Sequence, residues 1–516
     1  VYLVMLVMCH SLLARWGRWH SIISLMSPWL HSVYSPSQVR ELDQRAIAHL
    51  DVSGYELMCR AGQYAFDMGF ARFTQARHWL VLCGSGNNAG DGYVIARLAR
   101  AAGIEVTVVA ITDPSCLNGD AYKAFDDFRA AGGETQAYDP VSCPAGDLII
   151  DAMLGTGIDR DLEGPYLAAV KGVNLSDKPI LAVDIPTGIN GLTGEVMGVA
   201  INADVTVSFV GLKIGLFLAD GLNHGGELLF DDLGIPPSLS ADMVPGLLLF
   251  GEQDLAELLP VREPGSHKGM FGHVLVVGGN YGMAGAARMC AEAALRAGSG
   301  LVSVATRQAG VAAILSGRPE LMVHALEDAA DLSDLITRCS VIALGPGLGR
   351  DEWAKRCFDR LVQVDKPKVL DADALNILAE YPQHRNDWVL TPHPGEAARL
   401  LGVSVAEVQS DRLSAVQALQ SRYGGVAVLK GHGTLIAGEQ SVPFVVNGGN
   451  PGMATAGMGD VLTGVVAAIL GQTGGLQAPA AAAAYAHALA GDRAASEGER
   501  GMLASDLLQH LRTVLN

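Results

Sequence analysis

Short apolar segments alternate with segments of helical periodicity along almost the whole chain, and this alternation restricts the fold more than any other feature. Apolar segments of strand length lie at 79–83, 105–111, 148–151, 180–184, 205–210, 273–277, 301–305, 341–344, 369–371, 388–390 and 426–429. Helical spacing of apolar residues occurs at 37–50, 55–70, 253–259, 459–470 and 479–490. Strands that alternate with helices predict parallel, doubly wound sheets covered by helices on both faces.

The chain is long enough for more than one domain. It has 516 residues, 49% hydrophobic and 17% charged, which predicts a folded chain of two or three domains. The alternation breaks at about 233–265, where five prolines occur. We therefore expect a domain at 35–240, a linker at 241–264 and a second domain at 265–516. The halves share no residue-level repeat, so they are expected to be different domains.

The amino-terminal segment, residues 1–34, is set apart from this pattern. The apolar run Val1–Met8 has no basic region before it and is too short to cross a bilayer. Met26 lies just before the first regular pattern. We expect residues 1–34 to be disordered, or to extend upstream of the true start of the protein. Since no other segment resembles a transmembrane span, we expect a cytoplasmic protein with no membrane partner.

The charge balance excludes one class of function. With 36 basic and 54 acidic residues, the formal net charge is −18. A chain this acidic offers no broad basic surface to phosphates, so general nucleic-acid binding is not expected. The eight cysteines form no C-x-x-C pair, and the sequence has no zinc-site pattern.

Three polar clusters follow predicted strands in the first half: Asn87–Asp91, Asp151 with the loop Gly155–Asp161, and Asp184–Thr187. Ligands of doubly wound sheets bind at the carboxyl ends of strands, so the three clusters predict one shared site. A single glycine-rich turn or strand-end aspartate is often only structural, but three together favour a ligand site. The Asn87 cluster opens a helix, whose free N–H groups suit a phosphate.

The side chains in these clusters also indicate chemistry. Asn88, Asp151 and Thr187 supply hard oxygen ligands, which suit an alkali or alkaline-earth cation. Asp184 is a candidate general acid or base, because partial burial raises the pKa of a carboxyl group.

The runs NNAGDG, DAMLGTG and VDIPTGING resemble the amino-terminal domain of the NAD(P)H-hydrate repair enzymes over about 35–240. The resemblance implies a Rossmann-like three-layer domain that interconverts the R and S hydrates of NADH and NADPH. It implies that potassium binds Asn88, Asp151 and Thr187 and that Asp184 lies at the reacting carbon. The implied hydrate-binding residues are Asn87, Asn88, Ala89, Gly90, Asp91, Gly155, Thr156, Gly157, Ile158, Asp159, Arg160, Asp161 and Asp184. Relatives with this fold also serve as non-catalytic scaffolds, an alternative that the intact Asp184 disfavours.

The second half contains a denser pattern, a loop of small residues at 450–459 followed by Asp460 and an apolar helix. Consecutive N–H groups and the helix dipole form an anion site for a phosphoryl group. Asp460, in the first helical turn, is placed to take a proton from a hydroxyl that attacks this group.

Other strand-end loops of this half supply further candidates. Lys430–Thr434 combines a lysine with two glycines and suits nucleotide phosphates and ribose. Gly345–Gly349 is a second glycine-rich loop, and His393 lies between two prolines. Asp371 and Asp373 are interpreted either as a metal- or phosphate-side pair or, with slight preference, as a cap of the next helix.

The motifs GMGD, KGHGT, TPHPGE, GPGLG and SHKGMFGHVLVVGG resemble the carboxy-terminal, ribokinase-like domain of the same family over about 255–516. The resemblance implies an ADP-dependent dehydratase that phosphorylates the hydroxyl of the S hydrate and eliminates phosphate, giving NAD(P)H and AMP. It implies magnesium, without identifying its ligands. The implied ADP-binding residues are Lys430, Gly431, His432, Gly433, Thr434 and Gly459. The implied hydrate-binding residues are Ala286, Gly347, His393 and Asp460, with Asp460 as the base.

The resemblance therefore implies a bifunctional enzyme whose partners are small molecules, namely the hydrates and ADP. We also expect a homo-oligomer. The alternative function is a small-molecule kinase of ribokinase-like type with a non-catalytic amino-terminal binding domain, because the second site suits phosphorylation of any hydroxyl.

Overall fold

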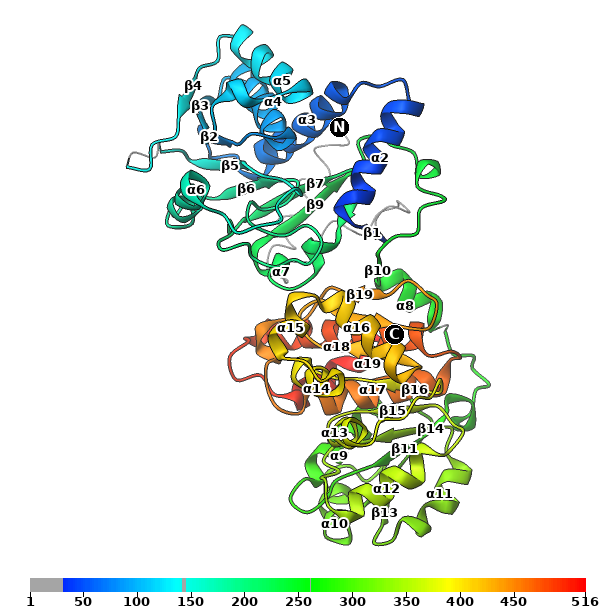
Figure 1. The fold of residues 1–516 in the computed structure, drawn as a ribbon. Coiled ribbons are helices and arrows are strands. Elements are labelled where there is room, and N and C mark those ends of the chain that lie inside the picture. Colours follow the sequence, from blue (N-terminus) through cyan, green and yellow to red (C-terminus); the bar gives the residue numbers. More distant parts are fainter. Residues whose placement is uncertain (1–30, 142–144, 260) are drawn as a thin grey trace. The chain divides into compact units, whose positions relative to one another are not determined.

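The computed structural model describes residues 31–141, 145–259 and 261–516, and the chain divides into two compact units. One unit ends at Leu247 and the other begins at Leu248. Each is a sheet with helices on both faces, as Figure 1 shows. Most of the predicted extension, residues 1–30, lies outside the described residues.

The sheet of the first unit is parallel. Within residues 31–141 and 145–247, seven strands pair in the order β4-β3-β2-β5-β6-β7-β9. Every neighbouring pair in this order is parallel. The strands are β2 (His78–Cys83), β3 (Glu105–Ala110), β4 (Thr135–Ala137), β5 (Leu148–Ala152), β6 (Ile180–Val183), β7 (Val205–Phe209) and β9 (Glu227–Asp231).

Both faces of this sheet are buried, which explains why its strands are apolar runs and not alternating ones. Along β2, Val81 and Cys83 belong to one hydrophobic cluster, whereas Leu80 and Leu82 belong to another. The first cluster contains side chains of α2 (Pro36–His49), α3 (Gly54–Arg72), α4 (Asn87–Ala101) and α5 (Gly119–Ala130). The second contains side chains of α6 (Gly164–Asn174). The short helix α7 spans Gly221–His224.

A separate short strand pair lies in the same unit. Strand β1 (Ser32–Tyr34) runs parallel to β8 (Leu212–Lys213), with Val33 opposite Leu212 and Tyr34 opposite Lys213. Val33 and Tyr34 are buried. This strand lies inside the segment 1–34 that the sequence analysis set apart, because three residues are too few to show a periodicity.

The sheet of the second unit is mixed. Within residues 248–259 and 261–516 the order is β13-β12-β11-β14-β15-β16-β17-β18-β19, followed by β10, which pairs with β19 through Leu248 and Leu249. The pairs β17–β18 and β18–β19 are antiparallel, and the others are parallel. The strands are β10 (Leu247–Leu249), β11 (His273–Val277), β12 (Leu301–Thr306), β13 (Met322–Ala325), β14 (Val341–Leu344), β15 (Lys368–Leu370), β16 (Trp388–Leu390), β17 (Val426–Leu429), β18 (Thr434–Ala437) and β19 (Phe444–Val446).

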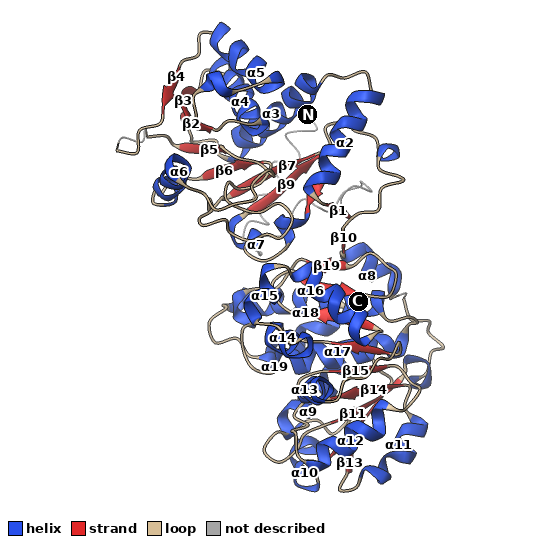
Figure 2. Ribbon diagram, in the orientation of Figure 1, coloured by secondary structure: helices blue, strands red, loops and turns tan. Residues whose placement is uncertain are grey.

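Helices cover both faces of this sheet, as Figure 2 shows. They are α8 (Glu252–Leu258), α9 (Ala284–Arg296), α10 (Gln308–Gly317), α11 (Ser333–Arg338), α12 (Glu352–Val362), α13 (Asp373–Glu380), α14 (Pro394–Leu401), α15 (Val405–Ser410), α16 (Arg412–Tyr423), α17 (Met458–Gln472), α18 (Gln477–Ala494) and α19 (Ala504–Val514). Helix α17 is buried along most of its length, which explains why it is apolar on all sides. It packs against α9, α18 and strand β14.

The predicted fold class, two doubly wound α/β domains, is confirmed, with the antiparallel pairs β17–β18 and β18–β19 as the difference. The sequence pattern did not indicate β18 or β19, which are short. The predicted linker at 241–264 contains β10 and α8, so part of it belongs to the second sheet. None of the helices within the described residues has the length and apolar character needed to cross a bilayer.

The close approach of α17 to α9 generates a stability prediction. A Cβ added at Gly464 would lie 2.0 Å from the carbonyl oxygen of Cys290 on α9. We expect Gly464→Ala to cost about 1–3 kcal/mol, since two packed helices must separate to relieve the contact. Thermal unfolding should show a lower midpoint. Gly285→Ala, in α9 but facing open space, is the control, and equal midpoints for the two variants would contradict the prediction.

Candidate active sites at the carboxyl ends of the strands

The first candidate site lies where the strand order of the first unit reverses. Strands β3 and β4 lie on one side of β2, and β5, β6, β7 and β9 on the other. The connections after β2 and β5 therefore leave in opposite directions and open a crevice at the strand ends, where ligands of such folds bind. Asn87 begins α4 after β2, Asp151 lies in β5, and Asp184 follows β6. The three predicted clusters thus meet at one edge of the sheet.

Asp151 and Thr187 form the buried floor of this site. The Thr187 hydroxyl donates to Oδ1 of Asp151 over 2.7 Å, and the Thr187 amide donates to Oδ2 over 2.8 Å. Both residues are inaccessible to solvent. Burial raises the pKa of Asp151 to about 6, although hydrogen bonds from Thr187 and Met153 oppose this rise. A cation beside Asp151 would favour its ionised form.

Asn88 lies near this floor with an unused amide group. The residue is 7% exposed, and neither Oδ1 nor Nδ2 has a hydrogen-bond partner among the described residues. A Cβ added at Gly155 would lie within 3.9 Å of both the Asn88 side chain and Oδ2 of Asp184. Gly155 therefore keeps a space open between these two side chains. Buried polar atoms rarely remain unpaired, so Asn88 indicates a ligand at this position.

The predicted nucleotide-binding residues lie on two segments around the crevice. Asn87–Asp91 forms the first turns of α4, and its N-cap is Gly86, which leaves the first helical amides open to a ligand. Gly155–Asp161 forms the loop after β5. Asn190 reaches this loop through a 3.4 Å hydrogen bond from Nδ2 to the Ile158 carbonyl oxygen. The loops after β5 and β6 therefore lie together.

Three charged residues lie near Asp184, of which Asp91 was predicted from the sequence and Lys213 and Asp43 were not. Lys213 contacts the Asp184 carboxylate through its ammonium group. Burial raises the pKa of Asp43 to about 6, with Asp184 adding to the rise and Lys213 opposing it. Burial also raises the pKa of Asp91, with contributions from Asp184 and Asp43. Lys213 follows strand β7 closely in the sequence, as the other site residues follow their strands, and this position was an available signal.

The second candidate site is centred on an ion pair. Nζ of Lys430, at the end of β17, lies 2.7 Å from Oδ1 of Asp371, at the end of β15. The Thr463 hydroxyl of α17 donates to Oδ2 of Asp371 over 2.8 Å. Asp371 is therefore the partner of Lys430 and not the helix cap that the sequence analysis preferred. A Cβ added at Gly459 would lie 3.2 Å from Nζ of Lys430, so the pair borders the first turn of α17.

Asp460 is in the first turn of α17, and its environment raises the pKa of its carboxyl group. Burial raises its pKa to about 7, the Asp371 carboxylate adds to the rise, and Lys430 opposes it. The N-cap is Gly457 in the left-handed conformation, with φ of 93°. Because this residue has no side chain, the amide groups of the first turn are open to an anion. A base with a pKa near neutrality thus lies beside an anion site.

His393 and Glu396 adjoin the ion pair. His393 is the N-cap of α14, with Nδ1 accepting from the Gly395 amide over 3.0 Å. Its side chain is 56% exposed, so the ring is accessible to a ligand. Glu396 is buried, 3.8 Å from Nζ of Lys430, and burial raises its pKa to about 7. The sequence analysis did not assign Glu396, although it lies within the motif that supplied His393.

Gly347, in the loop after β14, faces Ala286 in the first turn of α9. A Cβ at Gly347 would lie 3.2 Å from the Ala286 Cβ, and Gly347 has a φ of 59°. The same loop reaches the centre of the site, since the Gly349 amide donates to Oδ2 of Asp373 over 2.8 Å. Asp373 in turn contributes to the raised pKa of Asp460. The loop that carries Gly347 therefore contacts Asp373, which in turn acts electrostatically on Asp460.

A buried arginine holds the backbone of the loop Lys430–Thr434 by hydrogen bonds. Arg412 is 2% exposed and donates to the carbonyl oxygens of Leu429, Lys430 and Gly433 over 3.3–3.4 Å. Gly431 and Gly433 have φ of 138° and 69°, a backbone that favours glycine. His432 is exposed in this loop, and Thr434 begins β18 instead of ending the loop.

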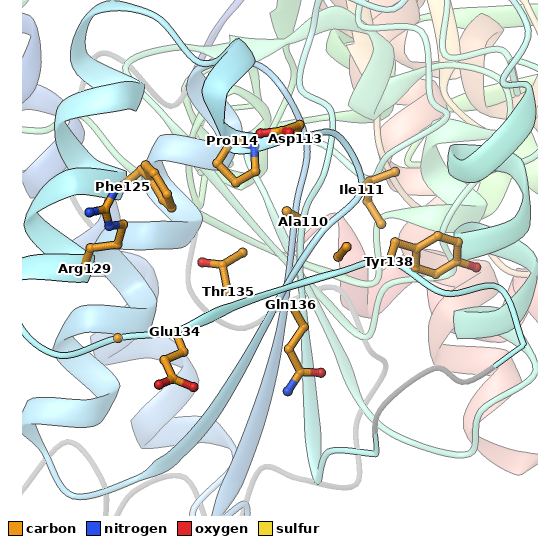
Figure 3. A pocket seen from close by; sticks show the side chains of 12 residues that line it. Ala110, Ile111, Asp113, Pro114, Phe125, Arg129, Glu134, Thr135, Gln136 and Tyr138 are labelled. Carbon is orange, nitrogen blue, oxygen red and sulfur yellow. The ribbon is translucent and has the colours of Figure 1, made fainter.

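A separate pocket of about 630 Å³ lies along β4 in the first unit. Figure 3 shows Phe125 and Arg129 on one side of it and Ile111 and Tyr138 on the other. It contains none of the residues that the sequence analysis predicted for a site, and we assign it no role.

Comparisons with known proteins agree with this arrangement. Residues 54–215 match the family model described as YjeF-related protein N-terminus, and residues 274–513 match the NAD(P)H-hydrate dehydratase model. The bifunctional NAD(P)H-hydrate repair enzyme Nnr of Coxiella burnetii (strain RSA 493 / Nine Mile phase I) is 46% identical over 94% of this chain and 99% of its own length. The enzyme of the same name from Escherichia coli (strain K12) is 45% identical over 94% of each chain.

Solved structures match over about half of the chain. The ADP/ATP-dependent NAD(P)H-hydrate dehydratase of Bacillus subtilis, co-crystallized with ATP/Mg²⁺, is 30% identical, with a TM-score of 0.47, and covers 52% of this chain and 96% of its own. A ribokinase-like superfamily protein of Enterococcus faecalis V583 is 32% identical, with a TM-score of 0.49, and covers 52% of this chain and 95% of its own.

Two doubly wound units, each with acidic and glycine-rich residues at its strand ends, define the class of two-domain α/β proteins with ligand sites at the carboxyl ends of the strands. Within that class, the extent of the identity decides the family. The chain belongs to the bifunctional NAD(P)H-hydrate repair enzymes, and the resemblance described from its motifs is confirmed.

Proposed function

We propose that the two units catalyse two successive reactions of NAD(P)H-hydrate repair. The first unit interconverts the R and S hydrates of NADH and NADPH. The second dehydrates the S hydrate to NAD(P)H at the expense of ADP, with AMP and phosphate as products. The observation that carries the proposal is the 46% identity to a bifunctional repair enzyme over both units. A dehydratase that fits one stereoisomer would let the other accumulate unless an epimerase interconverts them.

In the second unit, Lys430–Thr434 and Gly459 are proposed to hold ADP. Ala286, Gly347 and His393 are proposed to face the hydrate. Asp460 takes the proton of the hydrate hydroxyl while the oxygen of that hydroxyl attacks the terminal phosphorus of ADP. The bond between this phosphorus and the bridging oxygen breaks, which releases AMP. The phosphate ester then leaves as phosphate with its C–O electron pair. A proton is lost from the neighbouring carbon, and the ring double bond re-forms.

The ionisation state of Asp460 supports this role. A pKa of about 7 lets the carboxylate accept a proton at neutral pH and lets the resulting acid survive until the proton is released. The open amide groups at Gly457–Asp460 supply partial positive charge where the transferred phosphoryl group develops negative charge. Lys430 supplies a full positive charge at the same end of the helix.

Magnesium is proposed to enter this site with ADP. Among the described residues, no group of three or more His, Cys, Asp or Glu side chains is arranged to hold a metal ion. Magnesium commonly binds nucleotide phosphates and water with only one or two protein carboxylates. The ion would neutralise phosphate charge, and we assign it no protein ligand.

In the first unit, Asp184 is proposed to act at the reacting carbon, with Asn87–Asp91 and Gly155–Asp161 holding the nucleotide. Potassium is proposed to bind Asn88, Asp151 and Thr187. The unpaired amide of Asn88 and the buried carboxylate of Asp151 fit a cation that takes oxygen ligands. Such an ion would fix the floor of the crevice and favour the ionised form of Asp151.

Some expectations from the sequence stay predictions. They are the homo-oligomer, the cytoplasmic location and the absence of a nucleic-acid partner. The proposed function itself is tested by incubating the chain with mixed R and S hydrates, with and without ADP. Recovery of NADH from both isomers with ADP supports it. A stable phosphorylated product indicates the kinase alternative, and consumption of the S isomer alone indicates a non-catalytic first unit.

The division of labour predicts opposite effects of two isosteric variants. Asp460→Asn removes the proposed base of the dehydratase and should lower ADP-driven dehydration by roughly 10²–10⁴-fold while leaving epimerisation intact. Asp184→Asn should do the reverse. Each variant is the other's control, and equal loss of both activities in either variant would contradict the two-site division.

The pKa of Asp460 predicts the pH dependence of dehydration. A base must be unprotonated, so the rate at saturating substrate should rise as the pH increases through about 7. Lys430→Gln removes the cation that lowers this pKa, and the rise should move to higher pH. The rate is measured across pH 5–9 at saturating ADP, and Lys268→Gln, an exposed lysine of the same unit, is the control. An unmoved profile in Lys430→Gln would argue against Asp460 as the titrating base.

The proposed potassium site predicts how epimerisation depends on salt. Thr187→Val removes a hydroxyl that binds Asp151 and is proposed to bind the ion, so half-maximal activation should need roughly 10–100-fold more potassium. Thr187→Ser keeps the hydroxyl and is the matched control. The rate is measured against potassium chloride at constant ionic strength. Activity that is independent of potassium in the unaltered chain would remove the ion from the site.

A further inference from the structure

Lys213, the last residue of β8, is a buried lysine in the first unit. Its side chain is only 2% exposed. An ammonium group out of water is costly unless hydrogen-bonding partners take up its protons. The Lys213 ammonium has three such partners: the Asp184 carboxylate, the Ser208 hydroxyl at 3.1 Å and the Phe209 carbonyl oxygen at 2.7 Å. All three of its N–H donors are therefore used.

The contact with Asp184 is specific for one oxygen. Lys213 binds Oδ1 of Asp184. The other oxygen, Oδ2, lies on the side of Gly155 and is 3.9 Å from the position of an added Cβ there. That same position is 3.7 Å from Cβ and 3.8 Å from Cγ of Asn88. One carboxylate oxygen thus faces a buried cation, and the other faces the space between Asn88 and Gly155.

The backbone of Asp184 is also fixed. Its amide donates to the Val207 carbonyl oxygen over 2.7 Å, and its φ is 70°. Aspartate is among the few residues besides glycine that tolerate this left-handed conformation. The side chain is 20% exposed. Because the backbone is fixed and Oδ1 is bound, the carboxylate has little rotational freedom. Oδ2 is the oxygen that is left to contact a ligand.

Two further carboxyl groups lie near Lys213. Asp43 on α2 and Asp91 on α4 both interact electrostatically with Lys213 and with Asp184. The Asp184 carboxylate adds to the burial-raised pKa of both groups, and Lys213 opposes this rise. The direct contact of Lys213 is with Asp184, so of the three carboxyl groups only that of Asp184 is held in place by the ammonium group.

We propose that Lys213 is a positioning residue of the epimerase reaction, which binds Oδ1 of Asp184 and thereby directs Oδ2 of the same carboxylate toward the hydrate. This inference rests on the proposed role of Asp184. Ser208 supports the same arrangement, since its hydroxyl accepts a hydrogen bond from the Lys213 ammonium. Lys213 itself forms no bond with substrate in this scheme.

The test compares Lys213→Met with the unaltered chain. Methionine has a similar length and replaces a buried charge with an apolar group, so the unit is expected to fold. We expect epimerisation to fall by roughly 10²-fold, because an unrestrained and repelled carboxylate is misplaced for proton transfer. ADP-driven dehydration of the pure S hydrate should be unchanged, which checks the chain in the same sample. Lys171→Met, an exposed lysine of α6, is the matched control.

Two further readouts separate positioning from a merely structural role. Because Lys213 forms no bond with substrate in this scheme, Lys213→Met should lower kcat and leave KM within about threefold. In Lys213→Ala, added ethylammonium should restore part of the epimerase rate, whereas tetramethylammonium, which has no N–H donor, should not.

The outcomes distinguish this inference from the proposed function. If Asp184→Asn abolishes epimerisation but Lys213→Met keeps kcat within about threefold, the positioning role is wrong and the site assignment stands. If Asp184→Asn epimerises normally, the proposed role of Asp184 fails first. If Lys213→Met does not fold, the rescue experiment decides. An epimerase rate of Lys213→Ala that ethylammonium does not restore would overturn the inference.

Discussion

An ion pair between a lysine and a strand-end aspartate, with one of the two side chains buried, organises each of the two sites. In the first unit Lys213 binds Asp184, and in the second Lys430 binds Asp371. In both pairs the residues come from different strand ends and are far apart in sequence. A buried charge left without its partner is strongly destabilising, so each pair fixes the relative position of the strand ends that carry it. The rest of each site is arranged around this constraint.

The two pairs serve different chemistry. In the first unit the paired aspartate is itself the proposed reactive group, and the lysine directs it. In the second unit the paired aspartate does not react in the proposed mechanism, but its charge helps to raise the pKa of Asp460 nearby. The lysine there also borders the amide groups of α17 that are proposed to receive the phosphoryl group. A lysine–aspartate pair therefore orients a carboxylate in the first unit, and a second such pair affects the pKa of a neighbouring carboxyl group in the second unit.

The sequence predicted those features that a short run of residues determines. Buried parallel strands are apolar runs, so strands such as β11, β14 and β16 could be placed to the residue, and the polar motifs that follow the strands marked both sites. Features that depend on pairing between distant segments could not be predicted in this way. Strand β1 exists because it pairs with β8, and the charges of Asp43 and Asp91 matter because folding brings them to Lys213. The partner of Asp371 was missed for the same reason, since Lys430 lies 59 residues away.

The register of strand β1 has a practical consequence for dissecting the protein. Tyr34 is paired with Lys213, and Val33 also accepts a hydrogen bond from the Gly246 amide. A recombinant fragment that starts at residue 35, where the first helix begins, would lack the strand that holds the lysine in place. Such a fragment would keep every motif of the first site and still lose the support of its central ion pair. The smallest autonomous epimerase fragment should therefore begin before Ser32 and extend past Gly246.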